Sequence, residues 1–549
     1  MKPWLLPLFV GAVACGDQRT RADGVDAGGT LVIASTADPG TLFPPLVVST
    51  QGKQISEQIY DYLADVGPEM NTRGDKGFRG QLADSWTWAR DSMSIAFHVN
   101  PRARWHDGVR ADANDVAFTF ALNKDPGLAG RMETELTNID SVSVPDSSTA
   151  IFWFHARSPT QFLDAAAQLP ILPAHLLKSV TPQSLHDAPP SPVGTGRFRL
   201  KSWNHGTSLE LVADSSNYRG RAKLDRVIWS VTSAAPAAVA KLFGGEVDLF
   251  DGVRLENMAD LTKHRNVRVL ILPGTDYVFL LFNLRDPVQH SKPHQLFGDR
   301  NLRRALAMSI DRAALVTNVF DTLASVSLGP TVRAFDFTSP MIPQIPFDTA
   351  SGRAMLDSLG WAHLDKDGIR TRNGRALGFS LLVQSNSINR IRMATMIQAQ
   401  LKKMGVDVQI EIMDPAAQGA RLTTHTFDAS ISTWRLGASP DGTRGAWTRA
   451  GLEKSGVNYG SYENAQFDAQ LELALSADPA NSRTVFTKAF AIINQDAPAV
   501  WLYEPKTVLG IHKRVRTPRM RPDAWWIGLG DWFIPPTERI LRDRIPASR

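Results

Sequence analysis

The sequence predicts an α/β protein that is divided into two or three lobes. The chain has 549 residues, which is more than one hydrophobic core ordinarily accommodates. Strand patterns alternate with helical patterns along it, and residues 377–383, 393–404 and 406–412 form a strand, an amphipathic helix and a second strand. That order is expected of a β-α-β unit. The 43% hydrophobic and 21% charged residues are typical of a globular protein.

The N-terminus predicts a secretion signal followed by a polar tether. Lys2 precedes an apolar run at 4–14, which is too short to span a bilayer as a helix but has the length of a signal-peptide core. The sequence that ends at Cys15 resembles a bacterial lipobox, with Ala12 where Leu is usual. The alternatives are a buried or accidental Cys, or an ordinary signal peptide. We expect residues 1–15 to be a lipoprotein signal peptide, with Cys15 lipidated, and residues 16–29 to be a flexible tether.

Charge and motif searches give no support for nucleic-acid binding or catalysis. The formal net charge of +5 is small for this length, so no nucleic-acid partner is expected. We find no Gly-x-Ser-x-Gly, His-Glu-x-x-His or P-loop pattern, and Gly194-Thr195-Gly196 lacks the Lys-Ser/Thr of a phosphate cradle. His290 and His294 have a metal-compatible spacing if helical, but Pro293 argues against a helix. We therefore expect no catalytic residue, cofactor or metal.

The most informative stretch lies between residues 82 and 120. Residues 93–99 alternate in polarity as a strand does, Asp107-Gly108 forms a tight turn, and Asp112 is placed to cap a helix that carries Phe118 and Phe120. Taken alone, these features indicate a packed β-turn-helix scaffold.

Their order, however, resembles a family signature. Leu82-Ala83-Asp84-Ser85-Trp86, then Trp105-His106-Asp107-Gly108, then the helix from Ala113 to Phe118 are similar to the "LA.SW", "WHDG" and "A.DV.F" elements of the family 5 extracellular solute-binding proteins. Further similar segments follow at residues 169–177, 192–198, 246–249, 277–283, 309–312, 354–361, 427–434 and 497–503.

This resemblance implies a two-lobed periplasmic-binding-protein type II-like fold, with a hinged cleft and an inserted third lobe. Lobe I is expected to combine residues 30–67, 190–272 and 498–549. Lobe II is expected to be the insertion at 68–189, and lobe III to span 273–497.

The resemblance also implies a function. The protein would be the substrate-binding component of an ABC importer, a monomer that captures a peptide or peptide-like solute in the interlobe cleft and delivers it to permease subunits. It would lie on the periplasmic or cell-surface side, anchored to the membrane through lipidated Cys15. The alternatives are a receptor for a glycan, an opine or a metal chelate, or a sensor or hydrolase that reuses the fold.

The residues that the resemblance places at the cleft come from five segments. They are Val48, Ser49 and Thr50 after the first loop, Tyr277 and Asn283 on the 277–283 strand, Arg390 and Arg392 at a helix start, Trp434, Arg435, Gly437, Ala438 and Asp441 at a strand end, and Trp501 and Tyr503 on the returning strand.

Gly437 puts classical peptide recognition in question. In the peptide receptors an Asp three residues after the Trp of this segment binds the ligand's α-amino group, and here that position holds Gly437. A buried ammonium without a carboxylate is costly. Either Asp441 substitutes or the ligand lacks a free amino terminus.

Three interpretations of side chains stay open from the sequence. Arg390 and Arg392 could bind the ligand's carboxylate or be solvated charges at a helix start. The aromatic group Trp525, Trp526 and Trp532 could stack on a ligand or fill a packing gap. Asp311 and Arg312 are expected to form a structural pair within one helix that begins after Asp299 and carries Leu302, Leu306, Ile310 and Ala313 on one face.

Overall fold

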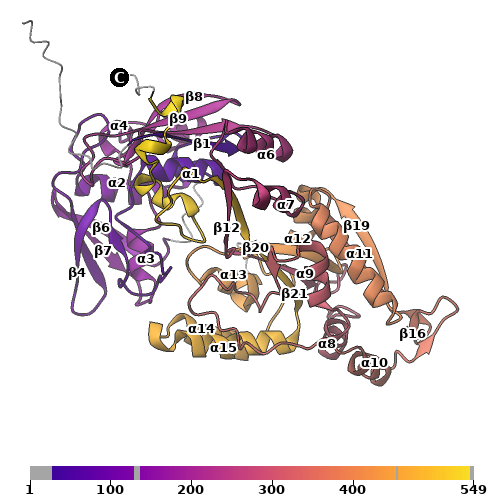
Figure 1. Ribbon diagram of the computed structural model, residues 1–549. Helices are drawn as coiled ribbons and strands as arrows, with labels where there is room; N and C mark the ends of the chain where they lie inside the picture. The colour runs from indigo at the N-terminus through magenta and orange to yellow at the C-terminus, as the bar shows by residue number, and fades with distance from the viewer. Residues whose placement is uncertain (1–27, 129–135, 453–455, 545–549) are drawn as a thin grey trace, which may run out of the picture.

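The computed structural model describes residues 28–128, 136–452 and 456–544 (Figure 1). The predicted signal peptide, Cys15 and most of the predicted tether lie outside these residues. Within the described ranges, no helix has both the length and the apolar character needed to cross a bilayer.

Lobe I is built on a seven-stranded sheet with the order β12-β22-β11-β1-β10-β9-β8. Its strands are β1 (Thr30–Ser35), β8 (Phe198–Asn204), β9 (Ser208–Ala213), β10 (Arg226–Val231), β11 (Leu249–Phe250), β12 (Val267–Leu272) and β22 (Thr507–His512), and its helices are α1 (Thr50–Ile59), α6 (Ala235–Gly244) and α7 (Leu255–Lys263). Strands far apart in sequence thus share one sheet, because the chain leaves this lobe twice and returns.

Lobe II is the first of these excursions. Its four-stranded antiparallel sheet has the order β4 (Ala83–Trp88), β5 (Ser94–Val99), β7 (Thr149–Phe154) and β6 (Ile139–Asp146), with helices α2 (Ala113–Asn123), α3 (Gln161–Ala166), α4 (Ala174–Leu177) and α5 (Pro182–Asp187). The predicted strand and the Asp112 cap of α2 are confirmed, and Asp112 and Asp115 form a capping box. Leu177 and Leu185 join the core of lobe I, although the sequence placed their helices in lobe II.

Lobe III contains a six-stranded mixed sheet. Its strands, in spatial order, are β14 (Ala324–Ser325), β21 (Ala499–Pro505), β13 (Asp276–Phe282), β20 (Ala429–Arg435), β18 (Gly378–Gln384) and β19 (Asp407–Met413). The expectation that residues 498–549 all belong to lobe I is wrong for β21, because β21 pairs with β13, and the chain returns to lobe I only after Pro505. Its helices are α8 (Arg300–Met308), α9 (Arg312–Phe320), α10 (Thr349–Ser358), α11 (Ile388–Lys402), α12 (Pro415–Thr423), α13 (Gly442–Trp447), α14 (Ala465–Leu475) and α15 (Pro479–Asp496). Strands β18 and β19 are parallel and joined by α11, which confirms the predicted β-α-β unit.

Two small sheets complete the fold. One pairs β2 (Ala64–Asp65) with β3 (Arg79–Gly80), and the other contains β15 (His363–Leu364), β16 (Arg370–Arg372) and β17 (Arg375–Ala376). Strands β15 and β16 form a hairpin around the turn at residues 365–368.

The expected pairing of Asp311 with Arg312 is wrong. The expected single helix is two helices, because the Asp311 carboxylate accepts the Ala314 N–H at 2.9 Å and so caps α9. The Arg312 guanidinium instead donates to Gln344 Oε1 and to the Ile345 carbonyl.

The two chain crossings between lobes I and III touch each other. One crossing joins β12 to β13 through Gly274, and the other joins β21 to β22 at Lys506. A Cβ atom on Gly274 would lie 1.9 Å from the Pro505 carbonyl oxygen, so only glycine permits this approach. Such a paired crossing is the usual place for a hinge between two lobes.

A third link between lobes is noncovalent. The segment between β2 and β3 reaches lobe III, where Met70 is buried in that lobe's core. The Arg73 guanidinium donates to the carbonyl oxygens of Ala474, Leu475 and Ala477 at the end of α14.

Candidate functional site

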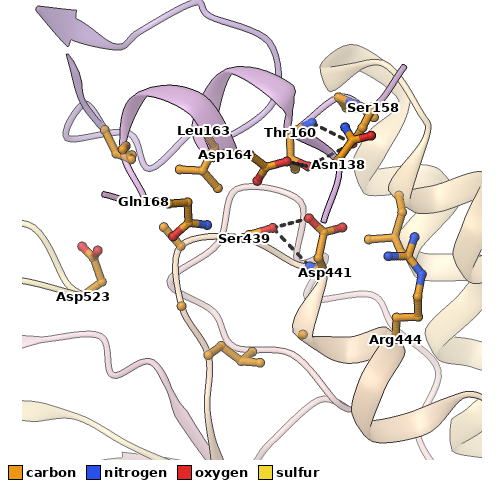
Figure 2. A pocket seen from close by; sticks show the side chains of 18 of the residues that line it. Asn138, Ser158, Thr160, Leu163, Asp164, Gln168, Ser439, Asp441, Arg444 and Asp523 are labelled. Atoms are coloured by element: carbon orange, nitrogen blue, oxygen red, sulfur yellow. Dashed lines mark hydrogen bonds between the residues drawn. The ribbon is translucent and has the colours of Figure 1, made fainter. Parts of the chain in front are cut away.

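A cavity of 910 Å³ lies where the three lobes meet. Lobe I contributes Lys53 and Glu57 from α1 together with Arg521 and Asp523, lobe II contributes Asn138, Ser158, Thr160, Asp164 and Gln168, and lobe III contributes residues 435–439, Asp441, Arg444 and Glu472. Figure 2 shows Thr160, Asp164 and Gln168 on one wall, with Ser439 and Asp441 on the other. A solute held here would touch every lobe.

The lobe III wall is the loop that follows β20. Arg435 ends the strand and forms a bidentate pair with Asp276, with Nε–Oδ1 2.8 Å and Nη2–Oδ2 3.1 Å. These hydrogen bonds raise the pKa of Arg435 above its usual value. Further along the loop, the Ser439 hydroxyl donates to Asp441 Oδ2 at 2.7 Å and accepts the Asp441 N–H. This loop therefore presents a fixed guanidinium and a fixed carboxylate.

The lobe I wall is held by buried ion pairs. The Arg521 guanidinium contacts Asp65 at 2.9 Å and Asp523 at 2.6 Å, and both carboxylates raise its pKa against the opposing effect of burial. Burial raises the pKa of Asp65, although Arg521 partly offsets that. Glu57 accepts hydrogen bonds from the Tyr62 hydroxyl at 2.8 Å and from Trp526 Nε1 at 2.6 Å.

Charges of both signs line the cavity in nearly equal number. Five Lys and Arg side chains face six Asp and Glu side chains. Many are paired with each other, as Arg444 is with Glu472 through two contacts of 2.7 and 2.8 Å. Such a lining suits a polar or zwitterionic solute better than one with a large charge of a single sign.

Four of the sequence-predicted residues line this cavity: Arg435, Gly437, Ala438 and Asp441. Thr50 lies next to them, since its hydroxyl oxygen accepts from Arg435 Nη1 at 3.3 Å. Ser49 and Val48 do not line it. The Ser49 hydroxyl caps α1 by accepting the Gly52 N–H, and Val48 is 71% exposed.

Four other candidates are buried in lobe III, so the expectation that they face the cleft is corrected. The Asn283 side chain is fully buried and donates to the carbonyls of His425 and Phe427, at the opposite end of β13 from Asp276. Tyr277, Trp501 and Tyr503 belong to an aromatic core, because β13 and β21 are neighbouring inner strands covered on both faces. Burial raises the pKa of the Tyr277 hydroxyl far above its usual value.

Of the last three candidates, Trp434 and Arg390 lie at a second, smaller cavity, and Arg392 lines neither cavity. Trp434 lines an apolar cavity of 160 Å³ in lobe III and stacks on Tyr459 with ring centroids 5.9 Å apart. Arg390 donates to Gln384, another residue of that lining, whereas Arg392 is exposed on α11.

Two alternatives left by the sequence are decided by burial. Trp525, Trp526 and Trp532 fill the core of lobe I rather than stack on the cavity. His294 is buried, and its ring accepts the N–H groups of Leu296 and Phe297, which is a structural role.

Sequence reasoning missed the whole lobe II wall and most of the lobe I wall. The polar residues of 156–168 carry no motif, and their only signal is a polar cluster, Ser158, Thr160 and Asp164, at the start of a short helix. The Arg521–Asp65 pair joins residues 456 positions apart, so no local pattern announces it.

Comparison with known proteins agrees with this geometry. The family model for bacterial extracellular solute-binding proteins, family 5 Middle, matches residues 77–453. The oligopeptide-binding protein AppA of Bacillus subtilis is 25% identical over 518 residues, which cover 91% of this chain and 92% of AppA.

Two solved structures share the fold. AppA from Bacillus subtilis in complex with a nonapeptide superposes with a TM-score of 0.76 at 24% identity, covering 93% of this chain and 99% of that one. NikZ from Campylobacter jejuni in complex with Ni(L-His) gives 0.75 at 22% identity, with 92% and 99% covered. Both support the two-lobed periplasmic-binding-protein fold. The family match, which covers more than half of the chain, shows that this protein belongs to the family 5 bacterial extracellular solute-binding proteins.

Proposed function

We propose that the protein captures a peptide or peptide-like solute in the cavity between its lobes and delivers it to the permease of an ABC importer. The observation that carries this proposal is the 910 Å³ cavity whose walls come from all three lobes. A solute that touches every wall favours the closed form, because only that form makes all the contacts. The closed form is then the one that a permease recognises.

The lining supports a peptide-like solute. The volume of the cavity lies at the upper end of the range usual for small-molecule sites, about 300–1,000 Å³. The Asp441 carboxylate stands in the wall loop, held by Ser439 at 2.7 Å, and supplies the anion that an α-amino group requires. Asp441 thereby takes the place of the carboxylate that Gly437 lacks.

Gly437 also supports a second candidate, a receptor for a solute without a free amino terminus, such as a glycan, an opine or a metal chelate. No Cβ at this position would contact another atom within 4 Å, so the space beside the loop is open. NikZ, which shares this fold, was solved with Ni(L-His), so the fold accommodates chelates.

The cellular setting belongs to the same proposal. Lipidation of Cys15 would hold a monomer on the outer side of a bacterial membrane, where it binds solute without changing it chemically. A sensor or a hydrolase that reuses the fold remains the competing class. Turnover of the bound solute would identify a hydrolase.

The test is native mass spectrometry of the purified protein, followed by denaturation and identification of any released solute. A peptide with a free amino terminus supports the first candidate. A glycan, blocked peptide or chelate supports the second and excludes the first.

The role of Asp441 is tested separately by calorimetry with the released solute. If Asp441 binds an α-amino group, Asp441→Asn weakens binding about tenfold or more, since it removes a charge-assisted hydrogen bond of about 1.5–3 kcal/mol. Asp260→Asn on the exposed face of α7 is the matched control and leaves the affinity unchanged. Equal affinity of Asp441→Asn and wild type would exclude Asp441 as the amine ligand.

A further inference from the structure

One end of the lobe I sheet gathers basic side chains. Strands β1, β10 and β12 begin there, and β22 ends there, as the register pairs Thr30 with Arg226 and Val267 with His512. We call this end the basic pole. Its side chains are Lys223, Arg265, Arg268, Lys513, Arg516, Arg539 and Arg544, with Ile540 and Leu541 among them.

The described C-terminal segment supplies most of this charge. Residues 513–544 contain eight Lys and Arg side chains against four Asp and Glu. Four of the eight, Lys513, Arg516, Arg539 and Arg544, belong to the basic pole and make up most of its seven basic side chains. All four acids are paired within the protein: Asp543 is buried against Arg514, Glu538 pairs with Arg516, Asp523 with Arg521, and Asp531 with Arg197. Glu246 adds one further exposed carboxylate near Arg542.

The basic pole contains a shallow depression. It is lined by Arg268, Lys513, Arg516 and Phe533, and Lys223 Nζ lies 4.9 Å from the centre of the Phe533 ring. The proximity of Arg516 and burial together lower the pKa of Arg268, burial being the larger cause. Clustered guanidinium groups over an open depression suit an anionic headgroup.

Apolar side chains project beside the basic ones. Ile540, which follows Arg539, is 43% exposed, and Leu541, which begins the 3₁₀ turn Leu541–Arg544, is 81% exposed. Exposed aliphatic residues flanked by arginines are typical of surfaces that lie on a bilayer, where the apolar groups enter the interface and the cations meet phosphates.

The described chain also begins at this pole. The Gly28 N–H donates to the Lys223 carbonyl, and a Cβ on Gly28 would lie 2.8 Å from the Arg539 guanidinium. Cys15 precedes Gly28 by thirteen residues, which can span at most about 45 Å when fully extended. A lipid on Cys15 would therefore keep the basic pole, rather than lobe III, close to the membrane.

We propose that the basic pole is a docking surface for anionic phospholipid headgroups. The crossings to lobe III leave lobe I at the opposite ends of β12 and β22, so docking at the pole leaves the cavity between the lobes accessible. The basic side chains support this proposal whether or not Cys15 is lipidated. The short distance between Cys15 and Gly28 supports it only if Cys15 is lipidated. This inference goes beyond solute capture, and either can fail without the other.

The test uses residues 16–549, which lack Cys15 but retain every described residue, in cosedimentation with vesicles. Vesicles of phosphatidylcholine alone are compared with vesicles that contain about 30% phosphatidylglycerol, each at low and at high salt. We expect binding to the anionic vesicles only and its loss in about 0.5 M salt, because salt screens exposed charges. Equal binding to both vesicles, or none to either, overturns the proposal.

Charge-reversal variants locate the surface. Lys513→Glu with Arg544→Glu alters two exposed residues of the basic pole, and each lost positive charge lowers partitioning about fivefold. The matched control, Lys366→Glu with Lys488→Glu, makes the same charge change on lobe III. We expect it to keep most of the wild-type binding to anionic vesicles. Equal loss in both variants would show a general charge effect and refute the assignment to the pole. Solute affinity, measured on the same variants, stays at the wild-type value.

Discussion

Arg435 of lobe III reaches Thr50 of lobe I across the cavity, with Arg435 Nη1 3.3 Å from Thr50 Oγ1. The same guanidinium is held on its own lobe by Asp276. The two lobes therefore meet through a side chain that is fixed before contact, which reduces the entropy that closure costs.

Replacing Thr50 with Val tests this contact. The change keeps the shape of the side chain but removes the acceptor, so the closed form loses about 1 kcal/mol, the net worth of one hydrogen bond. We expect about fivefold weaker solute binding by calorimetry, with an unchanged urea midpoint. Thr262→Val on the exposed face of α7 is the control. Unchanged affinity in Thr50→Val would mean that the contact does not contribute to closure.

Gly274 tests the paired crossing. Because a Cβ there would meet the Pro505 carbonyl oxygen at 1.9 Å, Gly274→Ala must push the two crossings apart. We expect a loss of about 1–3 kcal/mol in the free energy of unfolding, as for other overpacked sites. Gly419→Ala, in helix α12 with no atom within 4 Å of the added methyl, is expected to be neutral or slightly stabilising. Equal stability of the two variants would contradict the close approach.

Arg73→Ala removes the noncovalent link to lobe III. The buried guanidinium satisfies three carbonyls at the end of α14 and lies 5.2 Å from the centre of the Phe486 ring. Leaving these acceptors unpaired is expected to cost about 3 kcal/mol of stability in denaturant titration. Arg79→Ala on the exposed strand β3 should stay within about 0.5 kcal/mol of wild type. A small effect at Arg73 would mean that water replaces its contacts.

His106 makes stability depend on pH. Its Nε2 donates to the Gly196 carbonyl at 2.9 Å while its Nδ1 accepts the Gly194 N–H at 3.3 Å, an arrangement open only to the neutral ring. Burial lowers its pKa below 6.5. As pH falls, His106 therefore becomes protonated in the unfolded chain before it does in the folded chain. The stabilisation that neutral His106 gives the folded state is fully present above about pH 6.5 and is lost as pH falls below that.

We expect the free energy of unfolding to fall between pH 7 and pH 5, by at most about 1.4 kcal/mol per pH unit for this one group. His106→Gln should flatten the slope, whereas His155→Gln, an exposed histidine, should leave it unchanged. A wild-type slope in His106→Gln would show that other groups cause the dependence.

More of the fold than of the candidate site could be predicted from the sequence. Apolar alternation, the Asp112 cap and the β-α-β pattern are local, so residues 94–123 and 378–413 adopt the expected elements. The prediction that Tyr277 and Asn283 face the cleft was wrong because a strand buried on both faces has no polar side that marks a cleft. The Asn283 amide instead donates to a backbone carbonyl in the core of lobe III. The lobe II wall depends on how lobes pack, which no local pattern encodes.

Hydrogen–deuterium exchange with and without the solute tests the central claim most directly. If the solute binds between the lobes, amides around 50–57, 158–168 and 435–441 gain protection together, since these segments form the walls of one cavity. Protection confined to lobe III, for example around the small cavity beside Trp434, would contradict capture between the lobes.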